Sequence, residues 1–235
     1  MSEPRGYIFS LPLFPLHTVL LPQAPIQLHV FEERYRAMIG GCIERKEPFG
    51  VVQIKEGSEI GQPAIPEDIG CIAQILAVKT MDDGRIHLLA GGTERFRILE
   101  YAPADLQYLV GRVELLPDEE VEEEELKSWA DTILELFLSY VGDLTGRDDV
   151  TAEMLQMPTD PALLSYYVGS VLQMPPEILQ TTLEECNPVS RLRVMETYLI
   201  HLIESEGEET ASIILALPLD ANQNHWQNYR TEGRN

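Results

Sequence analysis

The spacing of lysine, serine and glycine defines the common nucleotide-binding and hydrolytic motifs. A phosphate-binding P-loop needs a lysine directly after a glycine, so that the amine reaches the phosphates. No lysine here follows a glycine, and no serine stands in a G-x-S-x-G elbow. The lysines are Lys46, Lys55, Lys79 and Lys127. Walker-type ATP hydrolysis and the serine-hydrolase elbow are therefore excluded.

Histidine and cysteine, the usual metal ligands, also lack a recognisable motif. None of the histidines precedes a glutamate, so the H-E-x-x-H zinc motif is absent. His201 and Glu204 stand three residues apart on an expected helix, which is more typical of a surface pair than of half a metal site. Cys42, Cys71 and Cys186 form no C-x-x-C pair, as is typical of reduced, buried thiols. We therefore predict no catalytic residue, no metal site and no cofactor.

The net charge of the chain and its lack of long apolar runs disfavour further classes of function. Its 235 residues include 17 Lys and Arg against 39 Asp and Glu, a net charge of −22. Binding to nucleic acid or to an anionic membrane needs a basic surface, so both partners are disfavoured. No apolar run approaches the roughly 20 residues that span a bilayer, and Met1–Arg5 does not open a signal peptide. We therefore expect a cytoplasmic protein.

The first half of the chain has the pattern of a small β-structure. Residues 1–115 carry 11 basic and 15 acidic groups, a net charge of −4. Asp83-Gly84 predicts a hairpin turn, Gly91-Gly92 predicts a turn or bulge, and the apolar spacing over Glu32–Lys46 predicts one helix. The expected strands are Ile26–Val30, Gly50–Ile54, Cys71–Thr80, Arg85–Ala90, Arg95–Tyr101 and Tyr108–Leu115. This pattern favours a partly open barrel over a βαβ array.

The second half is helical and much more acidic. Residues 116–235 carry 6 basic and 24 acidic groups, a net charge of −18. Helices are expected after the acidic run Asp118–Glu125, and at Asp160-Pro161, Pro176 and Asn187-Pro188, where capping residues or prolines begin them. Four or five helices should therefore form a bundle. The tail combines an acidic linker with the apolar segment 211–219, for which three outcomes stay open: packing on the body, docking on a partner, or disorder.

Several motifs together resemble the N-terminal domain of Lon protease. They are Leu11-Pro-Leu-Phe-Pro-Leu-His-Thr-Val-Leu-Leu-Pro22, Pro25–Tyr35, Phe49-Gly-Val-Val, Ile69-Gly-Cys-Ile-Ala-Gln-Ile, Gly92–Ile98 and Pro176-Glu-Ile-Leu-Gln with Arg191-Leu-Arg-Val-Met-Glu. The resemblance covers about residues 8–206 and implies an α+β fold. Its parts would be a PUA-like, partly open β-barrel over 1–116, a helical bundle over 117–206 and a tail over 207–235.

The residues that carry the resemblance have structural explanations. Prolines 12, 15, 22 and 25 should hold the chain extended between strands. Phe14, Leu16, Val19 and Leu20 should pack this segment against the rest of the protein. Phe31 and Tyr35 should fix the early helix on the barrel, and Phe96 should fill the barrel interior.

The resemblance implies recognition of polypeptide without its cleavage, because the ATPase and protease modules of full-length Lon are missing. The sequence is similar to stand-alone Lon substrate-binding-domain proteins and to the Lon-like part of cereblon. We predict a non-catalytic module that binds unfolded polypeptide or a partner protein, with basic, aggregation-prone chains favoured by the acidic half. A regulatory or structural subunit is the alternative, ahead of a small-molecule enzyme. No peptide-contacting residue is singled out, and the oligomeric state is left open.

Overall fold

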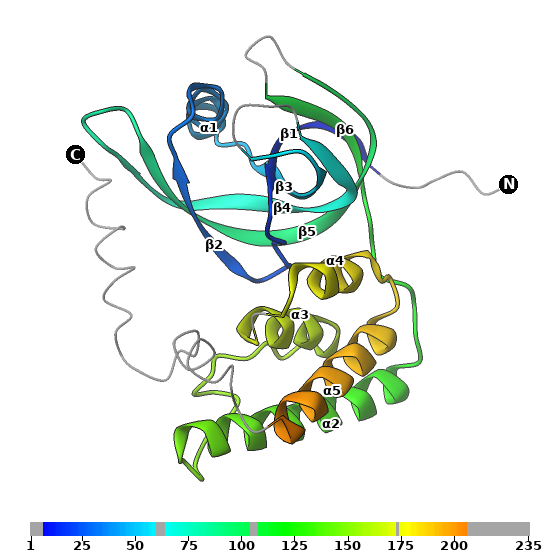
Figure 1. Cartoon of the computed structure of the whole chain (residues 1–235). Coiled ribbons are helices and arrows are strands. Elements are labelled where there is room, and N and C mark those ends of the chain that lie inside the picture. Colours follow the sequence, from blue (N-terminus) through cyan, green and yellow to red (C-terminus); the bar gives the residue numbers. More distant parts are fainter. Residues whose placement is uncertain (1–6, 60–63, 104–107, 173, 206–235) are drawn as a thin grey trace, which may run out of the picture. The chain divides into compact units, whose positions relative to one another are not determined.

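The computed structural model describes residues 7–59, 64–103, 108–172 and 174–205, which fall into two compact units. The unit that ends at Pro117, here called the sheet unit, contains all the described strands and one helix. The unit that begins at Asp118, here called the helical unit, contains four described helices (Figure 1). The α+β class predicted from the sequence is confirmed. The predicted tail, 207–235, lies outside the described residues.

The sheet unit is a mixed six-stranded sheet in the order β2-β5-β4-β3-β1-β6, in which β5 also pairs with β6. Its strands are β1 (Ile8–Leu16), β2 (Pro25–Val30), β3 (Phe49–Glu56), β4 (Ile65–Thr80), β5 (Ile86–Pro103) and β6 (Leu109–Leu115). Only β1 and β3 pair in parallel. The arrangement agrees with the predicted partly open barrel.

Strand β1 corrects one prediction, because its prolines lie within a strand and not in a connection between strands. β1 pairs with β6 over residues 8–13 and with β3 over residues 13–16, so only Leu13 has a strand on both sides. Among the described strands, Pro12 pairs only with β6 and Pro15 pairs only with β3. A proline cannot donate to a sheet, and it is tolerated where one side of the strand is unpaired.

The turn between β4 and β5 forms as predicted. Gly84 has a φ of 81°, and its N–H donates to the carbonyl of Met81. The turn or bulge predicted at Gly91-Gly92 is not a turn, because β5 runs through it as one strand. The bulge lies directly after Gly92, where Thr93 and Glu94 of β5 stand opposite Ile72 of β4 alone. A Cβ on Gly92 would lie 2.2 Å from the carbonyl oxygen of Leu21, so this position requires glycine.

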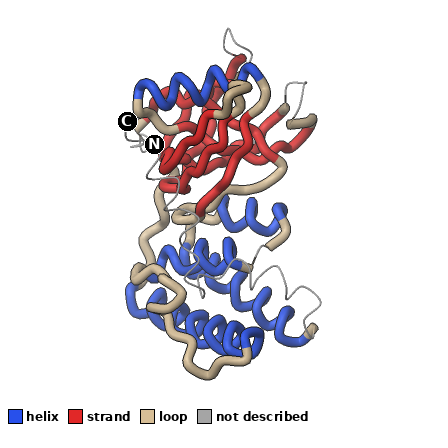
Figure 2. The backbone as a smooth tube through the Cα atoms, turned by 90° about the vertical axis from the view of Figure 1, so that its left-hand side faces the viewer, coloured by secondary structure: helices blue, strands red, loops and turns tan. Residues whose placement is uncertain are grey.

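The core of the sheet unit is apolar and continuous, with Phe96 fully buried in it as predicted. One cluster of this core contains Leu11, Leu13, Val52, Ile72, Phe96, Ile98, Leu109 and Val113. Helix α1 (Glu33–Arg45) lies against the sheet (Figure 2) and buries Tyr35, whose ring stacks on Phe14 at 4.3 Å. Tyr35 therefore fixes the helix as predicted. The same prediction is wrong for Phe31, whose side chain is 48% exposed.

The helical unit follows the capping signals of the sequence. Its helices are α2 (Glu123–Thr145), α3 (Pro161–Val171), α4 (Pro176–Glu184) and α5 (Pro188–Glu204). The side chain of Asp160 accepts a hydrogen bond from the N–H of Ala162 at the start of α3, and Asn187 accepts from the N–H groups of Val189 and Ser190 at the start of α5. None of the described helices is long and apolar enough to cross a membrane.

One buried cation holds the helical unit together. Arg191 on α5 is fully buried, and its guanidinium forms two hydrogen bonds with Asp118, at 2.8 and 2.6 Å. It also donates to Ser165 and to the carbonyl oxygens of Ala162 and Glu185. The ring of Tyr166 packs against its other surface, 4.4 Å from the guanidinium carbon. This network ties the residue that begins the unit to α3 and α5.

Candidate functional site

Two of the three thiols, those of Cys42 and Cys71, are unsuited to act as nucleophiles. Cys42 and Cys71 are buried, as predicted, whereas Cys186 is half-buried. Burial raises the pKa of Cys71 to about 12, and burial likewise raises the pKa of Cys42. Because the thiolate is the reactive form, neither group is a nucleophile near neutral pH. Both are core side chains.

The histidines do not assemble a metal site in the part of the chain that the structure describes. His201 and Glu204 are both exposed on the last turns of α5, and no group of three potential ligands forms among the described residues. The sheet does bring His29 of β2 opposite His87 of β5, with their rings stacked at 4.6 Å. The sequence does not predict this pair, because the pair depends on the register between two strands that lie far apart in the chain.

The most distinctive feature of the sheet unit is a pair of strand edges without a second partner. β3 pairs with β4 only over residues 65–73, so the segment 74–80 of β4 pairs with β5 on one side and with no described strand on the other. β2 likewise pairs with β5 alone. An unpaired edge presents main-chain N–H and C=O groups that can pair with another extended chain.

The edge of β4 also carries an exposed apolar side chain. Leu76 is 58% exposed and stands at a register shift between Ile75 and Ala77, where β4 bulges. The bulge and Lys79 are features that hinder indiscriminate edge-to-edge pairing. The edge therefore combines accessible main-chain groups, one large apolar contact and a local irregularity that limits aggregation.

The start of α1 is fixed close to the exposed ring of Phe31. Arg34 forms an ion pair with Glu32 at 3.1 Å and donates to the carbonyl oxygen of Glu59. Its guanidinium carbon lies 4.6 Å from the centre of the Tyr35 ring. Burial raises the pKa of Tyr35, so this side chain stays neutral and packs as an aromatic group. Phe31 thus directly precedes a helix start that is held by an ion pair, a hydrogen bond and an aromatic contact.

A family model described as the ATP-dependent protease La (LON) substrate-binding domain matches residues 10–201. The chain belongs to this family. Lon protease of Paraburkholderia phytofirmans is 26% identical over 204 residues, which cover 83% of this chain and 25% of that protein. Lon protease of Lawsonia intracellularis is 28% identical over 210 residues, which cover 86% and 25%. The chain thus spans about a quarter of the length of these curated relatives.

Solved structures of the Lon family share the fold. The Lon N-terminal domain protein from Xanthomonas campestris has a TM-score of 0.60 and 28% identity, and the match covers 81% of this chain and 99% of that one. The N-terminal domain of the Mycobacterium avium complex Lon protease has a TM-score of 0.66 and 20% identity, with 82% and 98% covered. The resemblance inferred from the sequence motifs is confirmed.

The sequence predicts most elements of the sheet unit, with β1 as an exception, but it does not predict the exposed surface of that unit. The run Cys71–Thr80 reads as one apolar strand, and nothing in it shows that β3 stops pairing at Ala73. The exposure of Leu76 and Phe31 has the same origin, since both residue types are normally assigned to a core. The only sequence signal for this surface is the alternation of apolar and polar residues along β2 and β5. It indicates that His29 and His87 point away from the side of the sheet that is buried.

Proposed function

We propose that the chain is a polypeptide-binding module without a catalytic step of its own, and that its sheet unit engages unfolded segments of other proteins in the cytoplasm. The family description, a substrate-binding domain, supports the binding role. The free cysteines suit a reducing compartment, and the net charge of −22 disfavours nucleic acid as the partner.

The observation that carries the proposal is the half-paired segment 74–80 of β4. Every extended chain offers the same main-chain groups, so strand addition to this edge recognises an unfolded state and not one particular sequence. Leu76 adds affinity because its exposed surface would be buried against an apolar side chain of the bound segment. The strands of a folded protein are already paired with each other, so a folded protein should not bind to this edge.

The test is binding of a permanently unfolded model protein, reduced and alkylated at its cysteines, measured by fluorescence anisotropy. We expect saturable binding of this probe and none of its native, disulfide-bonded form. Leu76→Ser should weaken binding, whereas Ile203→Ser, which changes a 46% exposed side chain on α5, should leave it unchanged. Absence of saturable binding, or equal loss in the two variants, would contradict the proposal.

A further inference from the structure

The sheet unit has a further open edge, at the end of the β4–β5 ladder that lies away from the hairpin. The two strands stop pairing at this end after Ile69 and Arg97. Beyond that pair, the segment 98–103 of β5 pairs with β6 on one side and with no described strand on the other. We call the unpaired side of this segment the β5 edge. It presents main-chain N–H and C=O groups that can pair with another extended chain.

Large apolar side chains are exposed beside the β5 edge. Leu99 and Tyr101 of β5 are 38% and 42% exposed, and Ile65 of β4 is 46% exposed. Ile65 and Tyr101 stand equally far beyond the pair of Ile69 and Arg97, so they lie at the same end of neighbouring strands. Burial of such side chains against an apolar partner is favourable. The β5 edge therefore combines main-chain groups with several apolar contacts.

Two irregularities restrict what can pair with the β5 edge. β5 bulges against β6 at a register shift between Ile98 and Glu100, and Pro103 has no N–H to donate. Bulges and prolines at an edge hinder the pairing of one sheet with another. The β5 edge is therefore better suited to a short extended segment than to the edge of a second folded copy.

The charged groups around the β5 edge leave carboxylates without a cation. Among the described residues at this end of the sheet, the exposed cations are all in ion pairs, which are Lys55 with Glu67, Arg97 with Glu114, and Arg112 with Glu100. Arg95 is only 4% exposed and is inaccessible to a ligand. Glu56, which stands opposite Ile65 in the register, and Asp68 are exposed and form no ion pair with a described residue.

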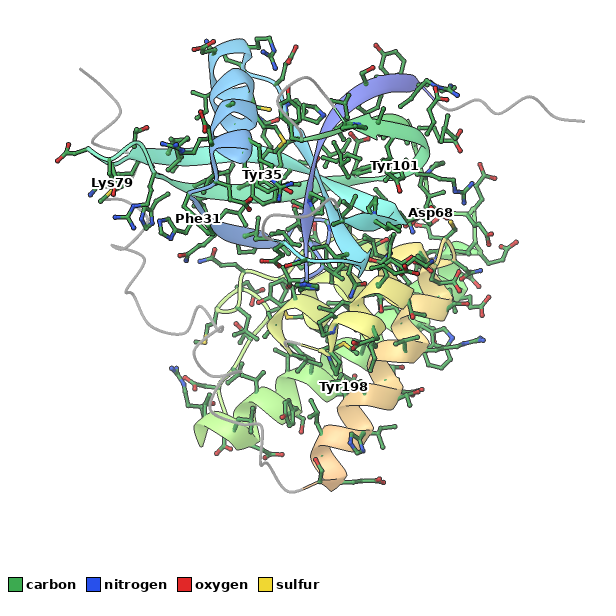
Figure 3. All side chains as sticks on the ribbon, turned by 45° about the horizontal axis from the view of Figure 1, so that its top comes forward. Phe31, Tyr35, Asp68, Lys79, Tyr101 and Tyr198 are labelled. Atoms are coloured by element: carbon green, nitrogen blue, oxygen red, sulfur yellow. The ribbon has the colours of Figure 1, made fainter. Side chains whose placement is uncertain are left out.

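These carboxylates lie close enough to the apolar side chains to act on the same bound segment. Figure 3 shows Asp68 and Tyr101 at the same end of the sheet unit, away from Phe31 and Lys79. A lysine or arginine on a segment at the β5 edge would meet a local field of favourable sign. Because the carboxylates are exposed, their effect should be modest and should weaken in high salt.

We propose that the β5 edge is a second polypeptide-binding site of the sheet unit, and that it takes short extended segments in which apolar side chains adjoin lysine or arginine. This inference goes beyond the proposed function, which concerns the segment 74–80 of β4. It places a preference for basic chains on the sheet unit, whereas the sequence predicts that preference from the acidic half. Two binding edges also allow one long unfolded chain to be held at both, which raises its overall affinity.

The probe is a synthetic peptide of alternating leucine and threonine, flanked by lysines and carrying a photoreactive leucine analogue. The same peptide flanked by glutamates is the comparison. After irradiation with the full-length protein, mass spectrometry locates the cross-links. We expect the lysine-flanked peptide to cross-link to residues 98–103 as well as to 74–80. The glutamate-flanked peptide should lose mainly the cross-links at 98–103.

Substitutions test the apolar and the charged contacts separately, through the peptide concentration that gives half-maximal cross-linking at 98–103. Tyr101→Ser should raise this concentration about fivefold, and Tyr101→Phe should leave it unchanged because the apolar ring remains. The double variant Glu56→Gln with Asp68→Asn should reduce the preference for lysines over glutamates about threefold in low salt. Met154→Ser, which changes a 41% exposed side chain in the helical unit, is the matched control and should alter neither value.

The outcomes separate this inference from the proposed function. Cross-links confined to 74–80, or a preference for lysines that is unchanged in the double variant, would overturn the inference and leave the proposed function in place. Cross-links confined to 98–103 would support the inference and would overturn the assignment of binding to the edge of β4.

Discussion

Arg191→Met tests the account of the helical unit most directly, because it removes the buried cation and nearly preserves the volume of the side chain. The guanidinium makes five hydrogen bonds: two to Asp118, one to Ser165 and two to main-chain oxygens. Its side chain is 0% exposed, whereas that of Asp118 is 28% exposed. The substitution therefore removes one hydrogen-bond donor from each of these acceptors, while Asp118 regains part of its hydration.

The magnitude follows from these contacts. Breaking a buried ion pair by removing one partner costs about 3–5 kcal/mol. The partial exposure of Asp118 lowers this value, and the loss of one donor to the main-chain oxygens of Ala162 and Glu185 raises it, so we expect a loss of about 3–4 kcal/mol in the free energy of unfolding of the helical unit. Asp118→Asn keeps the shape of the side chain and removes only its charge, so it should cost less, roughly 1–3 kcal/mol.

Urea unfolding followed by tryptophan fluorescence measures the effect. Trp129 lies on α2, and a Trp226→Phe background leaves it as the sole tryptophan, so the signal reports on the helical unit. Arg147→Met is the matched control, because Arg147 forms an exposed ion pair with Asp149 and such pairs contribute at most about 1 kcal/mol. A loss below about 1 kcal/mol for Arg191→Met, or one equal to that of the control, would refute the view that this network holds the unit together.

Three further substitutions have definite expected outcomes. Gly92→Ala should destabilise the sheet unit by about 2 kcal/mol or more in urea unfolding, because its Cβ would meet the carbonyl oxygen of Leu21. Asn187→Ala should cost the helical unit about 1 kcal/mol by removing the N-cap of α5. Burial raises the pKa of Tyr167 to about 12, so the native state retains a proton that the unfolded state loses, and stability should fall as the pH rises from about 10 to 12. Tyr167→Phe should flatten that part of the stability–pH curve, and an unchanged slope would argue against burial of the hydroxyl.

Elements set by local signals were predictable from the sequence. Asp160 and Asn187 stand directly before prolines, and the structure shows both side chains accepting hydrogen bonds at helix starts. Asp83-Gly84 marked its hairpin because the turn needs a positive φ, which Gly84 adopts. In each case the physical cause lies within a few residues of the chain, so spacing alone is informative.

Features set by pairing across the chain were not predictable. The prolines of β1 argue against a strand, and only the partners on its two sides show why Pro12 and Pro15 are accommodated. Similarly, Phe31 belongs to a residue type usually assigned to a core, yet it is exposed directly after β2, which is an edge strand among the described strands. The candidate surface depends on which edges remain unpaired, and that is a property of the whole sheet.

The position of β1 between β3 and β6 has a consequence for synthesis on the ribosome. β1 is synthesised long before β6, which ends at Leu115, so the side of β1 that pairs with β6 stays uncovered in the meantime. Until then a nascent chain carries an apolar strand with an open side, which makes it a target for chaperones or for misassembly with neighbouring chains. Ribosome stalling before this point should therefore yield nascent chains that are sensitive to protease, and stalling well beyond it should yield resistant ones.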